Sequence, residues 1–195
     1  MRILLVRHGQ TTGDVEDRYG GDYNDHLSAE GRKQTERLAE ELKDKHIELI
    51  ISSPLIRARE SAEIISGGII PIKIEDDFRE RNQYGILTGR IKSEAHRDYP
   101  DLVEKVKDRY ATIEGAESYE DFRKRVKAVF DRVVLSSTHT CIAVVWHGGA
   151  MRVLFRDILK KGELGKEIGD CAWVELEKEG EEFTILDLRR IEFLF

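Results

Sequence analysis

The sequence predicts an α/β fold with three layers, in which a mainly parallel central sheet lies between two layers of helices. Short apolar runs that are typical of strands alternate along the chain with longer segments whose apolar residues follow the helical period. The run Cys141–Trp146 is apolar throughout, as expected for a parallel strand that is buried on both faces. No linker-like composition interrupts this alternation, and 195 residues suit one domain, residues 1–195.

Three strands are expected in the first part of the chain, at Arg2–Arg7, Glu48–Ser52 and Ile69–Ile74. A helix separates each strand from the next. Ser28 is a good N-cap for the first helix, which runs to about Lys45, because its hydroxyl can accept a hydrogen bond from a free amide of the first turn. Pro54 opens the second helix, since proline is favoured in the first turn.

Residues 76–117 are richer in charge and less regular than the rest of the chain. Two short helices are expected within this segment, at Lys92–Tyr99 and Leu102–Tyr110. We interpret the segment as an excursion from the domain that covers its ligand pocket.

A long amphipathic helix is expected after this excursion, because Ser118 and Asp121 form a capping box before an apolar stripe. The strand Cys141–Trp146 follows. Gly148–Gly149 then leads into a helix that runs through Leu159.

The chain closes with two predicted strands, Cys171–Glu177 and Phe183–Ile191, on either side of a turn at Gly180. The two cysteines, Cys141 and Cys171, lie in strand-like runs, and we expect both to be reduced thiols in the core. Their spacing matches no metal site.

Composition and charge exclude several classes of protein. A net charge of −6 argues against binding to nucleic acid. No apolar run approaches the roughly 20 residues that span a bilayer, so no membrane association is expected. The first residues, MRILLVRHG, lack the layout of a secretory signal, and we expect a cytoplasmic protein.

Polar side chains follow three of the predicted strands at the point where each strand ends. Arg7 and His8 end the first strand, Arg57 lies just beyond the second, and His147 follows Cys141–Trp146. Because the carboxyl ends of parallel strands meet at one edge of a sheet, we expect these groups to lie together. The helix that opens at Gly148 adds free amides, so the pattern predicts a site for an oxygen-rich anion.

The motifs that contain these residues resemble those of the histidine phosphatase superfamily, in the branch that includes the cofactor-dependent phosphoglycerate mutases. The resemblance covers nearly the whole chain in order. It consists of LVRHGQT, RYGG, HLSAEGRKQ, SSPLIRARESAEI, RERNQYGILTG, GAESYEDFRKRV and VVWHGGAMR. It implies the phosphoglycerate mutase-like three-layer fold.

The resemblance also implies roles for the residues of the site. His8 would be the nucleophile that forms a phosphohistidine, and its other ring nitrogen should donate to an acceptor that fixes the tautomer. Arg7 and Arg57 would clamp the phosphoryl oxygens, and His147, which is also expected to be catalytic, would contact a third oxygen. Water would hydrolyse the phosphoenzyme.

A proton donor for the leaving oxygen is expected at Glu80. The family places a glutamate in a segment like ERHYG, whereas this chain has an extra residue before Gly85. Alignment on Gly85 would put Arg81 in that position. We favour Glu80, because an arginine cannot deliver a proton near neutral pH, and we expect desolvation to raise its pKa.

Asp14 stands where relatives generally carry an asparagine that donates to the phosphate. A carboxylate would repel a phosphoryl group, so we expect Asp14 to turn away and to bond to loop amides instead. Thr11 and the backbone at Gly148 are expected to replace the missing donor. Gly148 also separates this branch from the acid phosphatases, which carry an aspartate after the second histidine.

Weaker expectations concern the remaining aromatic and basic residues. Tyr19, Tyr84 and Arg90 lie in predicted loops and are candidates for contacts with the substrate. The remaining histidines have no metal-ligand spacing and are expected at the surface: His26, His46, His96 and His139. No metal or cofactor is expected.

The leading hypothesis is a phosphomonoester phosphatase that acts on a small phosphorylated metabolite through phosphorylated His8. A primer-dependent phosphoglycerate mutase is the alternative, although true mutases carry a longer insertion than the short stretch between Gly89 and Gly115. A third hypothesis is a phosphate-binding regulatory protein without turnover. The sequence leaves open which metabolite is bound and whether the chain forms a homodimer.

Overall fold

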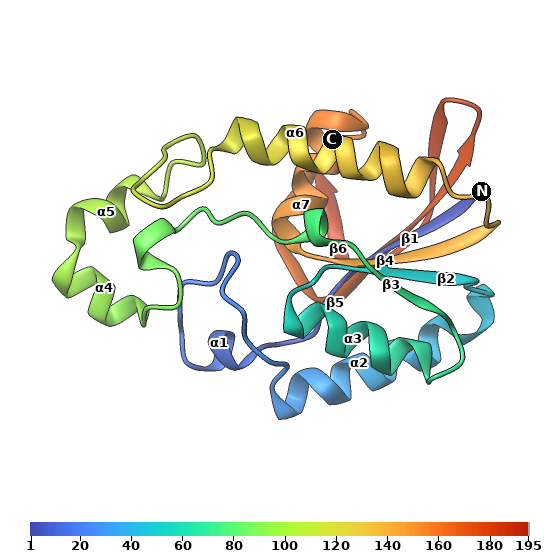
Figure 1. Cartoon of the computed structure of the whole chain (residues 1–195), viewed down its shortest axis with the longest axis horizontal. Coiled ribbons are helices and arrows are strands. Elements are labelled where there is room, and N and C mark those ends of the chain that lie inside the picture. The colour runs from blue at the N-terminus through green and yellow to red at the C-terminus, as the bar shows by residue number, and fades with distance from the viewer. Residues whose placement is uncertain (195) are drawn as a thin grey trace.

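A six-stranded sheet with the strand order β3-β2-β4-β1-β5-β6 forms the middle layer of the computed structural model, which describes residues 1–194, with the backbone alone at residues 166 and 167 (Figure 1). Strands β1 to β4 are mutually parallel, whereas β5 is antiparallel to β1 and β6 is antiparallel to β5. The predicted α/β fold with a mainly parallel sheet is therefore confirmed. The strands are β1 (Arg2–Arg7), β2 (Leu49–Ser52), β3 (Ile72–Ile74), β4 (Cys141–Trp146), β5 (Glu163–Glu179) and β6 (Glu182–Leu194).

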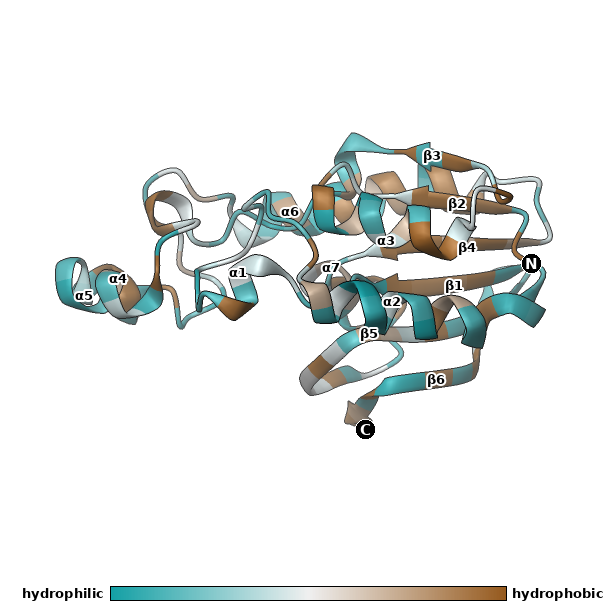
Figure 2. Cartoon of the chain, turned by 90° about the horizontal axis from the view of Figure 1, so that it is seen from below, coloured by the Kyte–Doolittle hydropathy of each residue, from teal (hydrophilic) through white to brown (hydrophobic). Residues whose placement is uncertain are grey.

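Two pairs of helices cover the two faces of the sheet (Figure 1). Helices α2 (Ala29–Leu42) and α3 (Ile56–Ser66) lie on one face, and α6 (Tyr119–Val129) and α7 (Gly148–Val153) lie on the other. Strand β1 contributes to both cores, because the side chains of Ile3 and Leu5 point to the α6 side and those of Leu4 and Val6 to the α2 side. Figure 2 shows the resulting pattern, with apolar residues concentrated on β1, β2 and β4.

The start of α2 fixes the loop that follows β1. Ser28 is its N-cap, as predicted, and accepts a hydrogen bond from the amide of Gly31 at 2.9 Å. A Cβ atom at Gly31 would lie 1.9 Å from the carbonyl oxygen of Gln10, so only glycine allows this close approach. The helix is thereby packed directly against the loop that carries the site.

The second helix begins later than predicted. Leu55 is its N-cap and Ile56 its first residue, so Pro54 precedes the helix instead of forming its first turn. Helix α3 ends at Gly67, which adopts the left-handed conformation that is common after a helix.

Residues 76–117 contain two 3₁₀ turns (Asp76–Phe78 and Gly85–Leu87) and the helices α4 (Lys92–Asp98) and α5 (Pro100–Lys105). These helices lie beside the short α1 (Thr12–Val15), away from the sheet (Figure 1). The segment has a small core of its own, formed with Tyr19 by Leu87, Ala95, Val103 and Ile113.

The predicted helix Leu102–Tyr110 is wrong in both bounds. The proline at position 100 suits the first helical position, so α5 starts earlier than the apolar pattern suggests. It also ends earlier, at Lys105, because the amides of Lys107 and Asp108 donate to the carbonyl oxygens three residues back and not four.

The capping box at the start of α6 is only half formed. Ser118 accepts from the amide of Asp121 at 3.1 Å, but the carboxylate of Asp121 accepts from the Ser118 hydroxyl and not from its amide. Helix α6 continues as a π-helical segment, Phe130–Leu135, and α7 continues likewise over Leu154–Ile158.

The two closing strands are longer than predicted. The pairing of β5 with β6 shifts register between Leu164 and Ile168 and again between Ile168 and Trp173. Such bulges break the alternation of apolar and polar residues, so the sequence pattern misses the first half of β5.

Cys141 and Cys171 are both buried free thiols. Over residues 1–194, no helix is both long and apolar enough to span a bilayer.

Candidate active site

His8 lies directly beyond the end of β1, and its side chain is buried against the loop that follows. Its Nδ1 atom lies 2.8 Å from the carbonyl oxygen of Gly9 and its Nε2 atom 3.0 Å from Nε of Arg57. A carbonyl oxygen can only accept and a guanidinium can only donate. The proton is therefore on Nδ1, and Nε2 presents its lone pair.

The electrostatic environment keeps this imidazole neutral. Burial, together with the charges of Arg57 and Arg7, holds the pKa of His8 well below its usual value near 6.5. A neutral imidazole is the nucleophilic form.

Arg57 reaches the site from the first turn of α3, and four acceptors orient its guanidinium. Besides the contact with His8, Nη1 donates to Asp25 Oδ1 at 2.9 Å and to the carbonyl oxygen of Tyr23, and Nη2 donates to the carbonyl oxygen of Gly21 at 2.7 Å. Arg57 and Asp25 are both almost completely buried. The two therefore form a buried ion pair at the wall of the site.

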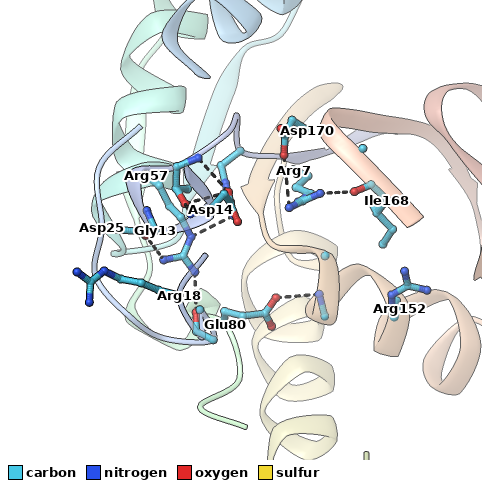
Figure 3. Close-up of a pocket in the computed structure, with 17 residues that line it drawn as sticks. Arg7, Gly13, Asp14, Arg18, Asp25, Arg57, Glu80, Arg152, Ile168 and Asp170 are labelled. Atoms are coloured by element: carbon cyan, nitrogen blue, oxygen red, sulfur yellow. Dashed lines mark hydrogen bonds and ion pairs between the residues drawn. The ribbon is translucent and has the colours of Figure 1, made fainter. Parts of the chain in front are cut away.

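Arg7 reaches the site from the other side (Figure 3). Its Nη1 donates to the carbonyl oxygen of Ile168, and its Nη2 lies 3.4 Å from Oδ1 of Asp170. His8 is thus flanked by two arginines, each held by a carboxylate and by at least one backbone carbonyl.

His147 caps α7 and lies behind His8, with the two ring centroids 5.1 Å apart. Its Nε2 atom lies 2.7 Å from the hydroxyl of Ser53, while its Nδ1 has no hydrogen-bond partner among the described residues. Burial, followed by the charge of Arg57, holds the pKa of His147 well below its usual value. His147 is fully buried, so its expected contact with a phosphoryl oxygen stays a prediction.

Glu80 lies across the site from Arg7, next to the start of α7 (Figure 3). Its Oε2 accepts from the amide of Gly149 at 2.8 Å, and its Oε1 accepts from the amide of Arg81 at 2.9 Å. Burial raises the pKa of Glu80, although these two amides act in the opposite direction. A Cβ atom at Gly149 would lie 2.6 Å from Oε1, so this arrangement requires glycine there.

The backbone around Glu80 is held by Arg125 of α6. Nη1 of Arg125 donates to the carbonyl oxygens of Asp77 and Arg79 at 2.7 and 2.8 Å, while Glu117 pairs with its Nε and Nη2. The position of Glu80 is therefore fixed on both sides, by α6 and by α7.

Arg81, the other residue considered for the position of the acid, points elsewhere. Its Nε and Nη1 donate to the carbonyl oxygens of Glu117 and Arg109, and its guanidinium packs on the ring of Tyr119. Glu80, not Arg81, lines the cavity beside His8.

Asp14 turns its carboxylate toward its own loop, as expected. Oδ2 accepts from both the amide and the hydroxyl of Thr11, while the amide of Asp14 donates back to that hydroxyl. This is a capping box for α1, which the sequence contains as a threonine followed three residues later by an aspartate. The Thr11 hydroxyl is thus engaged within the box, although Thr11 and Gly148 both line the cavity.

These groups surround a cavity of about 560 Å³. A second cavity of about 680 Å³ shares Arg18, Glu80, Gly149 and Arg152 with it and extends toward the excursion. Tyr84 lines this second cavity. The first cavity could therefore hold a phosphoryl group beside His8, and the second cavity, which the excursion lines, could hold the rest of a substrate.

Tyr19 and Arg90 line neither of these two cavities, so their expected contact with substrate stays a prediction. Tyr19 is buried in the small core of the excursion and packs on the ring of Tyr84, 4.8 Å between centroids. The Arg90 guanidinium lies over the ring of Tyr99 and donates to the carbonyl oxygen of Ile86. Both side chains are thereby used in packing.

Sequence reasoning missed several residues that line or support the site: Arg18, Asp25, Ser53, Arg152 and Asp170. Asp25 and Asp170 lie in no pattern that marks them, since their roles depend on the arginines they meet in space. Ser53 follows β2 directly, and its position at a strand end was a usable signal. No group of three metal-ligating side chains is placed to hold a metal ion within the described part of the chain.

The chain matches a known protein family and known relatives in sequence, and a solved structure in fold. The family model described as "Histidine phosphatase superfamily (branch 1)" matches residues 3–190. The "Uncharacterized phosphatase PhoE" of Bacillus subtilis is 32% identical over 157 residues, which are 80% of this chain and 76% of that protein. The "Phosphoglycerate mutase-like protein 4" of Arabidopsis thaliana is 31% identical over 159 residues, 78% of this chain and 69% of that protein.

A solved structure agrees with the fold over almost the whole length. The mycobacterial glucosyl-3-phosphoglycerate phosphatase, in a structure with VO3, has a TM-score of 0.81 and 27% identity, with 96% of this chain and 97% of that chain covered. The family model, the sequence relatives and the fold agree with the motifs. The chain belongs to the histidine phosphatase superfamily.

Proposed function

We propose that the protein is a phosphomonoester phosphatase that acts on a small phosphorylated metabolite through a phosphohistidine at His8. The observation that carries the proposal is the arrangement of His8, whose Nδ1–H donates to Gly9 while its Nε2 lone pair faces the arginine of the same cavity. Nε2 is the atom that would attack phosphorus.

The first step forms a bond between Nε2 and phosphorus and breaks the bond between phosphorus and the ester oxygen. Arg57 would exchange its hydrogen bond with Nε2 for a phosphoryl oxygen, and Arg7 would hold a second oxygen. Each cation about 4 Å from such an oxygen contributes on the order of 4 kcal/mol at an effective dielectric constant of 20. Two such cations therefore supply a large share of the stabilisation that phosphoryl transfer needs.

Glu80 would donate its proton to the leaving oxygen, so that an alcohol departs. In the second step the Glu80 carboxylate would take a proton from water, whose oxygen attacks phosphorus and releases His8 and inorganic phosphate. The raised pKa of Glu80 supports this role, because it favours the protonated form that the first step needs.

A primer-dependent phosphoglycerate mutase is the second candidate, and the adjoining second cavity favours it. Arg18, Lys92 and Arg152 line that cavity and could retain an anionic intermediate instead of releasing it. The phosphatase is preferred because the excursion is short.

A hydrolysis screen over phosphorylated metabolites, run beside a mutase assay with and without a bisphosphoglycerate primer, tests the proposal. Hydrolysis without mutase turnover is expected. Mutase turnover that exceeds hydrolysis would reverse the ranking, and the absence of both activities would favour a phosphate-binding protein without turnover.

A further inference from the structure

Arg7 divides its two terminal nitrogens between a backbone carbonyl and a carboxylate. Nη1 donates to the carbonyl oxygen of Ile168, and Nη2 lies 3.4 Å from Oδ1 of Asp170 (Figure 3). The Arg7 and Asp170 side chains are 22% and 26% exposed and line the same cavity. The carbonyl is a fixed part of β5, whereas the carboxylate is a side chain that can move away.

Asp170 is held close to the nucleophile by its surroundings. The amide of the next residue, Cys171, donates to the carbonyl oxygen of His8 at 3.1 Å. The amide of Gln10 donates to Oε1 of Gln34 at 3.0 Å, and the Gln34 side chain acts to lower the pKa of Asp170. The backbone at Asp170 is therefore fixed relative to the loop that carries His8.

Four arginines and four acids line this cavity. They comprise the arginines Arg7, Arg18, Arg57 and Arg152 and the acids Asp14, Asp25, Glu80 and Asp170. Each acid other than Asp170 has a role of its own, in the α1 capping box, on Arg57 or on the Gly149 amide. Among the described residues, Asp170 is the carboxylate that pairs with Arg7.

A phosphoryl oxygen bound by Arg7 would need the same N–H groups that face Asp170, and a carboxylate beside a dianion repels it. We propose that Asp170 is a positioning residue that competes with the phosphoryl group for Arg7 and thereby sets the affinity of the site for tetrahedral dianions and the pH dependence of that affinity. The proposal rests on the proposed function only in naming the phosphoryl group as the competitor.

The direction of the pH dependence follows from the groups that face Asp170, which are Arg7 from β1, Asp14 from α1 and Gln34 from α2. Burial raises the pKa of Asp170, Arg7 acts against this rise, and Asp14 adds to it. As the pH falls through this pKa, Asp170 becomes neutral and releases Arg7, so dianions bind more tightly. As the pH rises, the carboxylate returns and binding weakens.

Sulfate is a suitable probe, because it stays a dianion across the range in which Asp170 titrates, whereas phosphate changes its own charge. Sulfate binding is measured by titration calorimetry at about pH 5 and about pH 8, a range chosen around the usual behaviour of carboxyl groups. Asp170→Asn is expected to bind sulfate roughly tenfold more tightly than the natural protein at the higher pH. Its affinity should also change less between the two pH values.

Asp14→Ala is the matched control, since it removes one negative charge from the same cavity without touching an arginine and without adding a donor for the anion. It is expected to tighten sulfate binding much less than Asp170→Asn does. Glu80 also contributes to the pH dependence of sulfate binding, and this contribution remains in the natural protein and in both variants. Asp170→Ser serves as a second variant if Asp170→Asn folds poorly, which a thermal melt shows.

Equal sulfate affinities of the natural protein and Asp170→Asn at the higher pH would overturn the proposal. Equal tightening in Asp14→Ala and Asp170→Asn would also overturn it, because the effect would then be one of general charge. Sulfate affinity is measured without turnover. Failure to detect a phosphoenzyme would therefore contradict the proposed function and leave the test of Asp170 unaffected.

Discussion

The Nε2 atom of His8 accepts a hydrogen bond at 3.0 Å from Nε of Arg57, across 49 positions of sequence. The same arginine donates to Asp25, to Gly21 and to Tyr23. One guanidinium therefore links His8 to the loop that follows α1.

His8→Ala should abolish formation of a phosphoenzyme that is labile in acid and stable in base, because His8 lines the cavity with Nε2 available for attack, whereas the neighbouring imidazole of His147 is fully buried and does not line it. Labelling with a ³²P-phosphorylated substrate and acid or base treatment of the trapped protein measure this. His96→Ala is the control, since His96 is exposed on α4 and away from the site. Labelling that survives His8→Ala would assign the phosphoryl group to another residue.

Glu80→Gln should slow alkyl phosphates by about 10²- to 10⁴-fold but aryl phosphates with good leaving groups far less, because only a poor leaving group needs a proton. Comparison of kcat/KM for an alkyl phosphate and for p-nitrophenyl phosphate tests this. Equal losses on both esters would exclude Glu80 as the acid.

Gly149→Ala should reproduce part of that loss, since a Cβ atom would lie 2.6 Å from Oε1 of Glu80 and displace the carboxyl group. Gly148→Ala is the matched comparison one residue earlier, where a Cβ atom would meet its nearest neighbour, Cδ1 of Ile168, at 3.7 Å. The same pair of substrates distinguishes them. If both variants lose activity equally, the close contact with Glu80 is not the cause.

The pH profile for alkyl phosphates should have its descending limb set by Glu80. Burial raises the pKa of Glu80 above its usual value near 4.5, so the acid stays protonated to higher pH and the rate falls as the pH rises through the raised pKa. Burial keeps the pKa of His8 well below 6.5, so the nucleophile stays neutral well into acid. We expect kcat/KM of Glu80→Gln to lack this descending limb between about pH 4 and about pH 9, and a limb that persists unchanged would belong to another group.

Asp25→Asn should lower the free energy of unfolding by about 3 kcal/mol, because it leaves Arg57 buried without its charge partner. Urea unfolding measures this. Glu30→Ala, which breaks the exposed pair with Arg37, is the control and should cost less than about 1 kcal/mol. Similar losses in the two variants would show that the buried pair contributes no special stability.

The strands and the strand-end residues could be predicted from the sequence, because both depend on local patterns. The apolar run of β4 and the position of His147 after it follow from six consecutive apolar residues. Glu80 was chosen over Arg81 on chemistry alone, and the structure places Glu80 in the cavity. The bounds of β5 could not be predicted, since its bulges hide the strand period.

The partners of the arginines could not be predicted for a different reason. Asp25 and Asp170 meet Arg57 and Arg7 across loops and strands that are distant in sequence, and each is an ordinary acidic residue in its own neighbourhood. Tyr19 is the reverse case, because a loop tyrosine that looks exposed from the sequence is buried in the small core of the excursion. Such contacts are set by tertiary structure and leave no local pattern.

The excursion is stabilised by its own small cluster of apolar side chains, separate from the two cores that sandwich the sheet. Substitutions there can reshape the wall of the second cavity, while β1 keeps His8 at the end of a strand that lies between β4 and β5. On the proposed function, selection could thus change which ester is accepted without moving the residues that contact phosphorus. The residues of the excursion that shape the second cavity and the strand that carries His8 therefore belong to different packing units of the fold.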